Sequence, residues 1–248
     1  MRNRVGRLAI LTGAAGTIGK VTSHQLINEG HTVVGVDIDA DGLAQISEEL
    51  GKQFQPIAAD LSSEKGMVDC CTRIRRDYGH AGILINNAGI IRGEKFLKTR
   101  LEDLRHVMAL NFETAFVMSQ QMIPDMVDAG GGRIINVSSF AGRSGGLLAG
   151  TAYSLSKTAM IGLTYSLARE FGPKGISTNA IAPAFVRSEM MNSSFKNPGD
   201  EQNLINSIPL RRMCDPEEVA SAIIYLASDL SGFINGEVLD INGGVQCD

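Results

Sequence analysis

The chain has 248 residues, of which 44% are hydrophobic and 20% charged, and this size and composition predict a single globular domain of the α/β kind. Its 23 basic and 27 acidic side chains leave a net charge of -4. Because a nucleic-acid-binding groove or a polybasic membrane-binding face needs a basic excess, we expect neither a nucleic acid nor a membrane as a partner.

Residues 1–11 loosely imitate a secretory signal, but their apolar segment, 8–11, is too short and is soon followed by Gly13. No apolar stretch approaches the roughly 18 residues that are needed to cross a bilayer. The four cysteines have no metal-ligand spacing; they are Cys70, Cys71, Cys214 and Cys247. We therefore expect free thiols, no metal site and a cytoplasmic protein.

Short apolar segments alternate with longer segments of helical period along the whole chain. Strands are predicted at residues 8–11, 32–36, 54–59, 83–86, 133–137, 177–181 and 238–241. Helices are predicted at residues 18–29, 43–50, 63–78, 101–129, 151–171 and 216–228. Continuously apolar strands that alternate with helices are typical of a parallel sheet covered on both faces. We therefore predict one doubly wound domain over residues 1–248.

Residues 184–214 interrupt this alternation, because they are polar and irregular. Their scattered apolar side chains are Met190, Met191, Phe195 and Leu204. A long insertion of this composition, late in such a fold, is typical of a lid or a binding loop. We expect this segment to cover the substrate.

A glycine-rich turn follows the first predicted strand and leads into a helix. Its residues Gly13, Gly16, Thr17, Ile18 and Gly19 are candidates for binding a pyrophosphate at the helix N-terminus. The turn does not match a P-loop, because its outer glycines are one residue too far apart and Val21, not Ser or Thr, follows Lys20. The remaining alternative is a plain strand-to-helix turn.

Asp37 stands directly after the second predicted strand, about 20 residues beyond the turn, where dinucleotide-binding proteins have an acidic residue. Its carboxylate can accept hydrogen bonds from a ribose 2′-hydroxyl, whereas a 2′-phosphate there would be repelled by on the order of 1–4 kcal/mol. Ala15 and Ile38, where a compensating base could stand, are uncharged. We therefore expect NAD rather than NADP. Alternatively, Asp37 is a turn or helix-capping residue that selects no cofactor.

Tyr153 and Lys157 are four residues apart in a predicted helix, so their side chains share one face. A surface contact between a tyrosine and a cation is the plain alternative. Further polar residues end predicted strands or interrupt the helix 101–129; they are Asn86, Asn87, Ser138, Ser139 and Asn111. Ligands of open α/β sheets bind at the carboxyl ends of the strands, where most of these residues stand.

Over essentially its whole length, the sequence resembles the short-chain dehydrogenase/reductase family. The matching pieces, in chain order, are residues 12–19, Asp60, Asn86-Asn87-Ala88-Gly89, Asn111, Ser139, Tyr153 with Lys157, residues 179–183, and Asn242-Gly243-Gly244. The resemblance implies a Rossmann domain with a seven-stranded parallel sheet and helices on both faces. It also implies an oxidoreductase that interconverts a secondary alcohol and a ketone by hydride transfer with a nicotinamide cofactor.

By this resemblance, Ser139, Tyr153, Lys157 and Asn111 form the catalytic group. Tyr153 would exchange a proton with the substrate oxygen, and Lys157 would lower the pKa of Tyr153 and bind the nicotinamide ribose. Ser139 would orient the substrate oxygen, with Ser138 as the alternative. Asn111 would help to hold a water that relays protons, or would be an ordinary polar residue of the helix interior.

The resemblance also extends the cofactor-binding set. Besides the glycine turn and Asp37, this set contains Asp60, Leu61, Asn87, Ala88, Gly89, Tyr153, Lys157, Pro183, Val186 and Ser188. Asp60 could instead cap the helix that follows it. The sequence departs from the family pattern at Thr17, where a glycine is usual, at Ala184, and at Ser188, where a threonine is usual.

The substrate stays unassigned, because the sequence resembles both 3-oxoacyl thioester reductases and sugar-acid dehydrogenases. Its pocket would be lined by the turn after Gly89, residues 145–150 and the lid. Arg92 could receive a substrate carboxylate or could simply be solvated. A non-catalytic dinucleotide-binding sensor is the alternative function.

The resemblance further implies a homo-oligomer, a tetramer or a dimer, built on the helices 101–129 and 151–171. Small residues on the second of these helices would allow close packing; they are Ala152, Ser156, Ala159 and Gly162.

Overall fold

Seven parallel strands form one sheet in the part of the chain that this computed structural model describes, residues 7–146, 149–192 and 195–247. They are β1 (Leu8–Thr12), β2 (Thr32–Asp37), β3 (Phe54–Ala58), β4 (Ile83–Asn86), β5 (Gly132–Val137), β6 (Ile176–Pro183) and β7 (Val238–Ile241). Their order in the sheet is β3-β2-β1-β4-β5-β6-β7. The predicted fold class, a doubly wound α/β sheet, is therefore confirmed, and each predicted strand is present with small changes at its ends.

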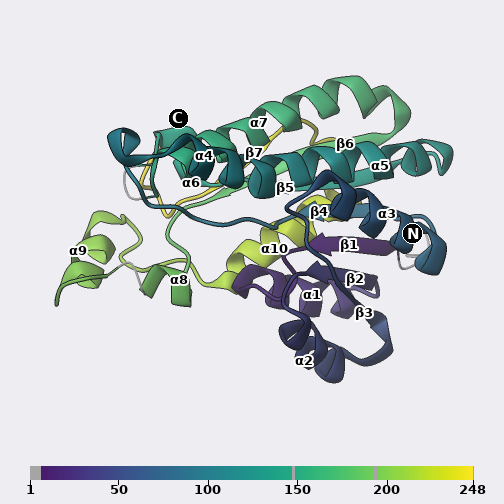
Figure 1. The fold of residues 1–248 in the computed structure, drawn as a ribbon, viewed down its shortest axis with the longest axis horizontal. Helices are drawn as coiled ribbons and strands as arrows, with labels where there is room; N and C mark the ends of the chain where they lie inside the picture. Colours follow the sequence, from purple (N-terminus) through teal and green to yellow (C-terminus); the bar gives the residue numbers. More distant parts are fainter. Residues whose placement is uncertain (1–6, 147–148, 193–194, 248) are drawn as a thin grey trace.

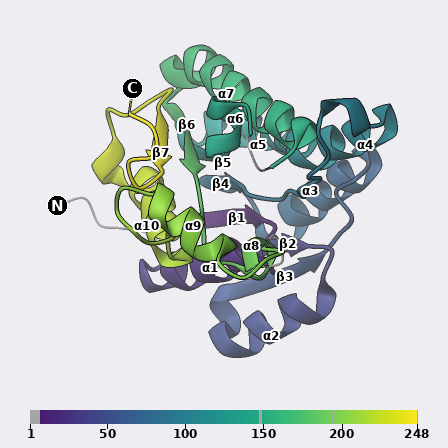
Figure 2. The ribbon, with the colours of Figure 1, turned by 90° about the vertical axis from the view of Figure 1, so that its left-hand side faces the viewer.

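Helices cover both faces of the sheet (Figures 1 and 2). On one face lie α1 (Thr17–Asn28), α2 (Ala40–Leu50) and α10 (Pro216–Ala227). On the other lie α3 (Glu64–Tyr78), α5 (Thr114–Asp128) and α7 (Thr151–Phe171). Consecutive strand residues point to opposite faces, so Ile10 of β1 packs with α3 and α5, whereas its neighbours Ala9 and Leu11 pack with α1. Burial on both faces explains why the strands are continuously apolar.

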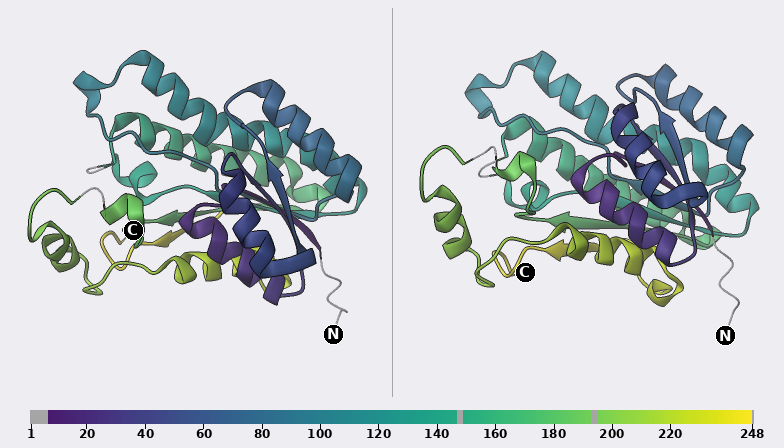
Figure 3. Two further views of the ribbon diagram at one scale, coloured as in Figure 1. Left: turned by 60° about the horizontal axis from the view of Figure 1, so that its bottom comes forward. Right: turned by 90° about the horizontal axis from the view of Figure 1, so that it is seen from below.

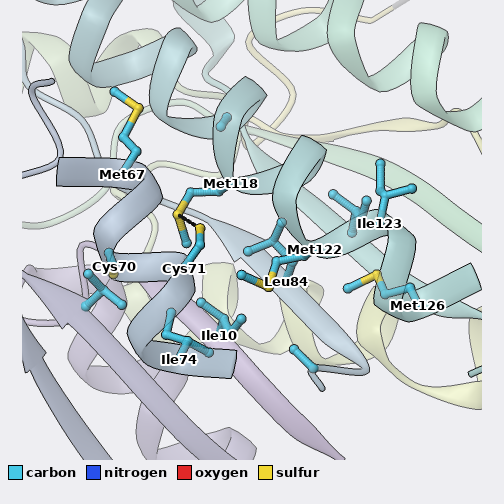
Figure 4. Packing of buried hydrophobic residues seen from close by; sticks show 14 of the residues in the cluster. Ile10, Met67, Cys70, Cys71, Ile74, Leu84, Met118, Met122, Ile123 and Met126 are labelled. Carbon is cyan, nitrogen blue, oxygen red and sulfur yellow. Dashed lines mark hydrogen bonds between the residues drawn. The ribbon is translucent and has the colours of Figure 1, made fainter. Parts of the chain in front are cut away.

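The core between the sheet and the helices α3 and α5 is rich in sulfur (Figure 4). The Sγ atom of Cys71 lies 3.3 Å from the Sδ atom of Met118. Burial raises the pKa of Cys70 to about 11 and that of Cys71 to about 12, so neither thiol forms a nucleophilic thiolate at neutral pH. All four cysteines are free thiols, as predicted.

The predicted helix 101–129 is present as one unbroken helical segment, but it is not α-helical throughout. It consists of α4 (Leu101–Met108), a five-residue π-helix (Ala109–Glu113) and α5. Asn111 lies in the middle of the π-helix, and such wide turns occur frequently at functional sites. Periodicity cannot reveal the π-helix, because one inserted residue leaves a helical pattern on both sides.

Among the described residues, three short α-helices were not predicted: α6 (Phe140–Ser144), α8 (Glu189–Asn192) and α9 (Asp200–Ser207). The last two lie in the segment 184–214, so the expectation of an irregular segment is wrong for these residues. The carboxylate of Asp200 accepts from the backbone N–H groups of Lys196 and Asn197, which stabilises the start of α9. Both helices lie beyond the carboxyl ends of the strands (Figures 1 and 3). Residues 193 and 194 of the expected lid lie outside the described residues.

The strand order reverses between β1 and β4. The strands β2 and β3 follow β1 toward one edge of the sheet, and β5, β6 and β7 follow β4 toward the other edge. Ligands of open α/β sheets bind at such a point of reversal, outside the carboxyl ends of the strands. This edge carries Thr12, Asn86 and the residues that follow β5. None of the described helices is both long and apolar enough to cross a membrane.

Candidate active site

The glycine turn brings the end of β1 against the end of β4. Gly13 has a φ of +68°, and a Cβ atom there would lie 2.9 Å from Ala88 Cα and 2.9 Å from Asn87 Nδ2. Only glycine allows this approach. The contact is held by Thr12, whose Oγ1 accepts from the N–H groups of Asn87 and Ala88, each at 3.0 Å. In return, Asn87 Nδ2 donates to the Gly13 carbonyl at 3.0 Å.

Gly16 is the N-cap of α1, and no described side chain caps this helix. Its φ of −73° suits any residue, and a Cβ there would make an ordinary contact at 3.4 Å with the Gly13 carbonyl. The fold itself therefore does not require glycine at this position. Gly16 and Thr17 are exposed, so the uncapped helix N-terminus is accessible. These features fit the binding of a pyrophosphate, with Thr17 in place of a glycine.

Asp37 connects the end of β2 to the glycine turn. Its Oδ2 accepts from the Ala15 N–H at 2.9 Å, and its Oδ1 accepts from the Asp39 N–H at 3.1 Å. The N-cap of α2 is Asp39, which accepts from Gly42, so the helix-capping alternative for Asp37 is wrong. Asp37 can hold the turn and also accept a hydrogen bond from a ribose hydroxyl, because its carboxylate lies beside the turn that would hold the nucleotide.

The two serines after β5 have different partners. Ser138 is buried, and its hydroxyl donates to the Lys157 carbonyl at 2.7 Å. Ser139 is the N-cap of α6, where its Oγ accepts from Ala141 at 3.1 Å. Ser139 also lies near enough to Tyr153 for its side chain to lower the pKa of Tyr153. The geometry therefore favours Ser139 over Ser138 as the residue that would touch a substrate oxygen.

The electrostatic environment of Tyr153 differs from the expectation. Burial raises the pKa of Tyr153 above its ordinary value, and the opposing influence is the nearby Ser139 side chain rather than the charge of Lys157. Lys157 Nζ lies 5.6 Å from the centre of the Tyr153 ring and donates to the Val137 carbonyl at 2.8 Å. Burial lowers the pKa of Lys157 to about 8. Both groups are thus shifted toward their neutral forms, as desolvation requires.

The Asn111 side chain is almost fully buried and has three hydrogen bonds. Its Oδ1 accepts from the Ile90 N–H at 2.8 Å, and its Nδ2 donates to the Ile90 carbonyl at 2.9 Å and to Ser156 Oγ at 3.0 Å. These bonds use both amide protons of Asn111, so its side chain has no donor left for a water. A Cβ at Gly89 would lie 3.1 Å from Asn111 Oδ1 and 3.4 Å from Lys157 Nζ. The structure thus brings Gly89, Asn111 and Lys157 together.

The structure places two outer members of the cofactor-binding set as follows. Asp60 is exposed, and its carboxylate accepts from Ser62, which holds the pKa of Asp60 below its ordinary value. The N-cap of α3 is Ser63, so the helix-capping alternative for Asp60 is wrong. The Leu61 side chain lies in the core, which leaves its backbone to face a cofactor.

Three further members follow the end of β6. Pro183 is the last residue of that strand, and its carbonyl accepts from Ser139 Oγ at 3.4 Å. Val186 forms an isolated parallel bridge with Cys214. Ser188 Oγ accepts from the Met191 N–H at 3.1 Å, at the start of α8. The segment that would cover the substrate therefore leaves the sheet beside Ser139.

The loop after β4 lies against the start of α7. The Thr151 N–H donates to the Glu94 carbonyl at 3.1 Å, and a Cβ at Gly150 would clash with the Arg92 carbonyl. Arg92 itself is exposed. Residues 147 and 148 of the expected pocket wall lie outside the described residues. The side chain of Met190 is not described either.

A pocket at the carboxyl end of β7 contains none of the catalytic or cofactor-binding candidates, but much of its lining comes from the expected lid 184–214. Its lining residues are Phe185, Ile208, Leu210, Arg212, Cys214, Glu218, Ile241, Asn242 and Gly243. The described residues contain no cluster of three or more His, Cys, Asp or Glu side chains that could hold a metal.

Proteins of similar sequence and structure are known. Residues 13–246 match a family model described as enoyl-(acyl carrier protein) reductase. The chain is 33% identical over 244 residues to the 3-oxoacyl-[acyl-carrier-protein] reductase FabG of Vibrio harveyi, which covers 98% of each chain. It is 36% identical over 246 residues to nodulation protein G of Azospirillum brasilense, which covers 97% of this chain and 98% of the relative.

A solved structure from Beutenbergia cavernae, assigned as an NAD(P)-dependent gluconate 5-dehydrogenase with NADP bound at low occupancy, superposes with a TM-score of 0.92. Its sequence is 29% identical, and the match covers 98% of this chain and 97% of that chain. The family model and the relatives extend over nearly the whole chain and include both the nucleotide-binding half and the half that carries Tyr153. The chain is an oxidoreductase that belongs to the short-chain dehydrogenase/reductase family.

Proposed function

We propose that this protein interconverts a secondary alcohol and a ketone, with NAD(H) as the redox partner. The observation that carries the proposal is the meeting of Ser139, Tyr153 and Lys157 beside the glycine turn, at the carboxyl edge of the sheet. When bound, the nicotinamide ring supplies the hydride donor or acceptor and, in its oxidised form, a positive charge beside Tyr153.

Tyr153 is the proposed acid and base. In the oxidation direction its phenolate takes the proton of the substrate hydroxyl, and in the reduction direction its phenol returns that proton. Ser139 donates a hydrogen bond to the substrate oxygen and so fixes the distance between this oxygen and Tyr153. Lys157, whose pKa is about 8, is mostly protonated at pH 7, and we propose that its ammonium group binds the nicotinamide ribose.

The position of Asp37 supports NAD over NADP. Its carboxylate lies 2.9 Å from the Ala15 N–H, at the turn that would hold the pyrophosphate, so a 2′-phosphate would meet a negative charge. The structure from Beutenbergia cavernae contains NADP. Our proposal of NAD for this chain therefore rests on Asp37, and it is tested by measuring both cofactors on this chain.

The relatives suggest two substrate classes, 3-oxoacyl thioesters and sugar acids. Residues 184–214 are proposed as the lid, because this segment leaves β6 directly after Pro183, whose carbonyl accepts from Ser139. Arg92, on the loop held between Asn111 and Thr151, is the proposed receptor for a carboxylate if the substrate is a sugar acid.

The first experiment measures NADH and NADPH consumption with 3-oxoacyl thioesters, keto sugar acids, simple ketones and cyclic ketones. We expect turnover with one class, and a decrease of about 10²- to 10⁴-fold in kcat for Tyr153→Phe with retained NADH binding, because only the acid–base group is lost. Equal turnover by Tyr153→Phe would refute the role of Tyr153. NADH binding without turnover on any compound would favour the non-catalytic sensor.

A further inference from the structure

Ser156 lies between the catalytic helix α7 and the π-helix. Its side chain is completely buried, and its Oγ accepts from Asn111 Nδ2 at 3.0 Å. The same hydroxyl donates to the Tyr153 carbonyl at 2.7 Å, one turn earlier in α7. One hydroxyl group therefore joins the Asn111 side chain to the backbone of Tyr153.

We propose that Ser156 is a positioning residue that holds Asn111 and the π-helix in register with Tyr153 and Lys157. This inference rests on the proposed function. Two of the three hydrogen bonds of Asn111 go to Ile90, on the loop after β4, and the third goes to Ser156. Without Ser156, Asn111 stays attached to the loop but loses its tie to the helix that carries Tyr153.

The loss of this tie has a chemical consequence at the site. The Asn111 amide lies next to the position of Gly89, which is also close to Lys157 Nζ. A displaced Asn111 changes the backbone of the π-helix beside the group that exchanges the proton. The proton transfer that involves Tyr153 should therefore slow, whereas cofactor binding at the glycine turn should not change.

The test is Ser156→Ala. We expect kcat to decrease about tenfold, because Asn111 is no longer held against the helix that carries Tyr153, with an unchanged KM for NADH. The solvent deuterium isotope effect on kcat should increase, because proton transfer becomes more limiting. Ser156→Cys keeps a weak donor and acceptor, so its kcat and its isotope effect should lie between those of the parent protein and those of Ser156→Ala.

Thr164→Val is the matched control. Thr164 is also buried in α7, and its Oγ1 accepts from Asn136 Nδ2 at 2.9 Å and donates to the Met160 carbonyl at 2.8 Å. The variant loses the same two kinds of hydrogen bond, two turns further along the helix. We expect a decrease in Tm with kcat and the isotope effect unchanged. Equal losses of kcat in both variants would assign Ser156 to general stability and overturn the inference.

A double-mutant cycle tests whether Ser156 acts through Asn111. In an Asn111→Ala background, Ser156→Ala should have no further effect on kcat. Independent, multiplicative losses would contradict the proposed coupling.

A second readout does not depend on turnover. Amide hydrogen exchange at residues 109–113 should be faster in Ser156→Ala than in Thr164→Val when each variant is measured at the same interval below its own Tm. Unchanged exchange would overturn the inference even if no substrate is found. A parent protein that binds NADH but reduces no carbonyl compound would refute the proposed function, and faster exchange would still show that Ser156 holds the π-helix.

Discussion

Buried titratable groups at the site reduce the stability of the fold in exchange for chemistry. The Lys157 ammonium lies in the interior, where it donates to the Val137 carbonyl, and burial lowers its pKa from 10.5 to about 8. A lowered lysine pKa means that the unfolded chain binds more protons than the folded one between these two values. The charged form of Lys157 therefore destabilises the folded state at neutral pH.

Lys157→Met should consequently stabilise the cofactor-free protein at pH 7 by about 2–3 kcal/mol while it abolishes turnover. The destabilisation of the folded state by the Lys157 charge is fully present below pH 8 and disappears as the pH rises to 10.5. Urea unfolding of both proteins at pH 7 and pH 10 measures this difference. A difference in free energy of unfolding that does not change with pH would show that burial of the charge is not its cause.

Asp37 allows a test of cofactor choice at a single residue. Asp37→Ala should reduce the NAD/NADP preference about tenfold or more, because the repulsion of a 2′-phosphate is removed and the bond to a 2′-hydroxyl is lost. The ratio of kcat/KM for NADH and NADPH measures the effect. Asp39→Ala, which removes the N-cap of α2, is the control and should reduce Tm without changing the ratio. An unchanged ratio in Asp37→Ala would contradict the assigned role.

At the scale of elements, the site depends on the close approach of α6 and α7. A Cβ at Gly142 in α6 would lie 2.7 Å from the Lys157 carbonyl carbon and 2.9 Å from the Thr158 nitrogen in α7. Thr158 Oγ1 donates to the Gly142 carbonyl at 2.7 Å across the same contact. Because Ser139 is the N-cap of α6, this contact sets the position of Ser139 relative to Tyr153.

Gly142→Ala should therefore force the two helices apart. We expect a loss of about 1–3 kcal/mol in the free energy of unfolding and a decrease in kcat, since Ser139 moves away from Tyr153. Chemical denaturation and steady-state kinetics measure the two effects. Thr158→Val removes the hydrogen bond without adding volume, so it should affect kcat less. A larger loss in Thr158→Val would assign the effect to the hydrogen bond and not to the close approach.

For the whole molecule, the outer face of α5 and α7 exposes large apolar side chains. Phe116, Leu155 and Tyr165 are each about half exposed, at 46%, 50% and 50%. Of the small residues noted in α7, Ala152 and Ser156 pack inward, whereas Gly162 lies on the exposed side. An apolar helical face of this kind supports the proposed homo-oligomer.

The double variant Leu155→Asp, Tyr165→Asp should dissociate the oligomer, because two charges would be buried in the interface. Light scattering after size-exclusion chromatography gives the mass of the parent and of the variant. Lys52→Asp, which adds negative charge at an exposed position near β3, is the control and should keep the mass of the parent. A monomeric parent would refute the oligomer, and an undisturbed oligomer in the double variant would place its interface elsewhere.

The alternation of apolar strands with amphipathic helices was sufficient to predict the seven strands and the parallel, doubly wound sheet, since local patterning reflects burial on two faces. Residue types and spacing predicted that the glycine turn, Asp37 and polar strand ends lie at the carboxyl edge, and the family resemblance assigned roles to Ser139, Tyr153 and Lys157. What the tertiary structure decided are contacts between distant segments. These contacts hold Asn111 of the π-helix to Ile90 and Ser156, and they give Ser138 and Ser139 different hydrogen-bond partners. They also bury Tyr153, which raises its pKa. Each depends on desolvation or on packing between elements far apart in the chain, and no local pattern of residues encodes such distances.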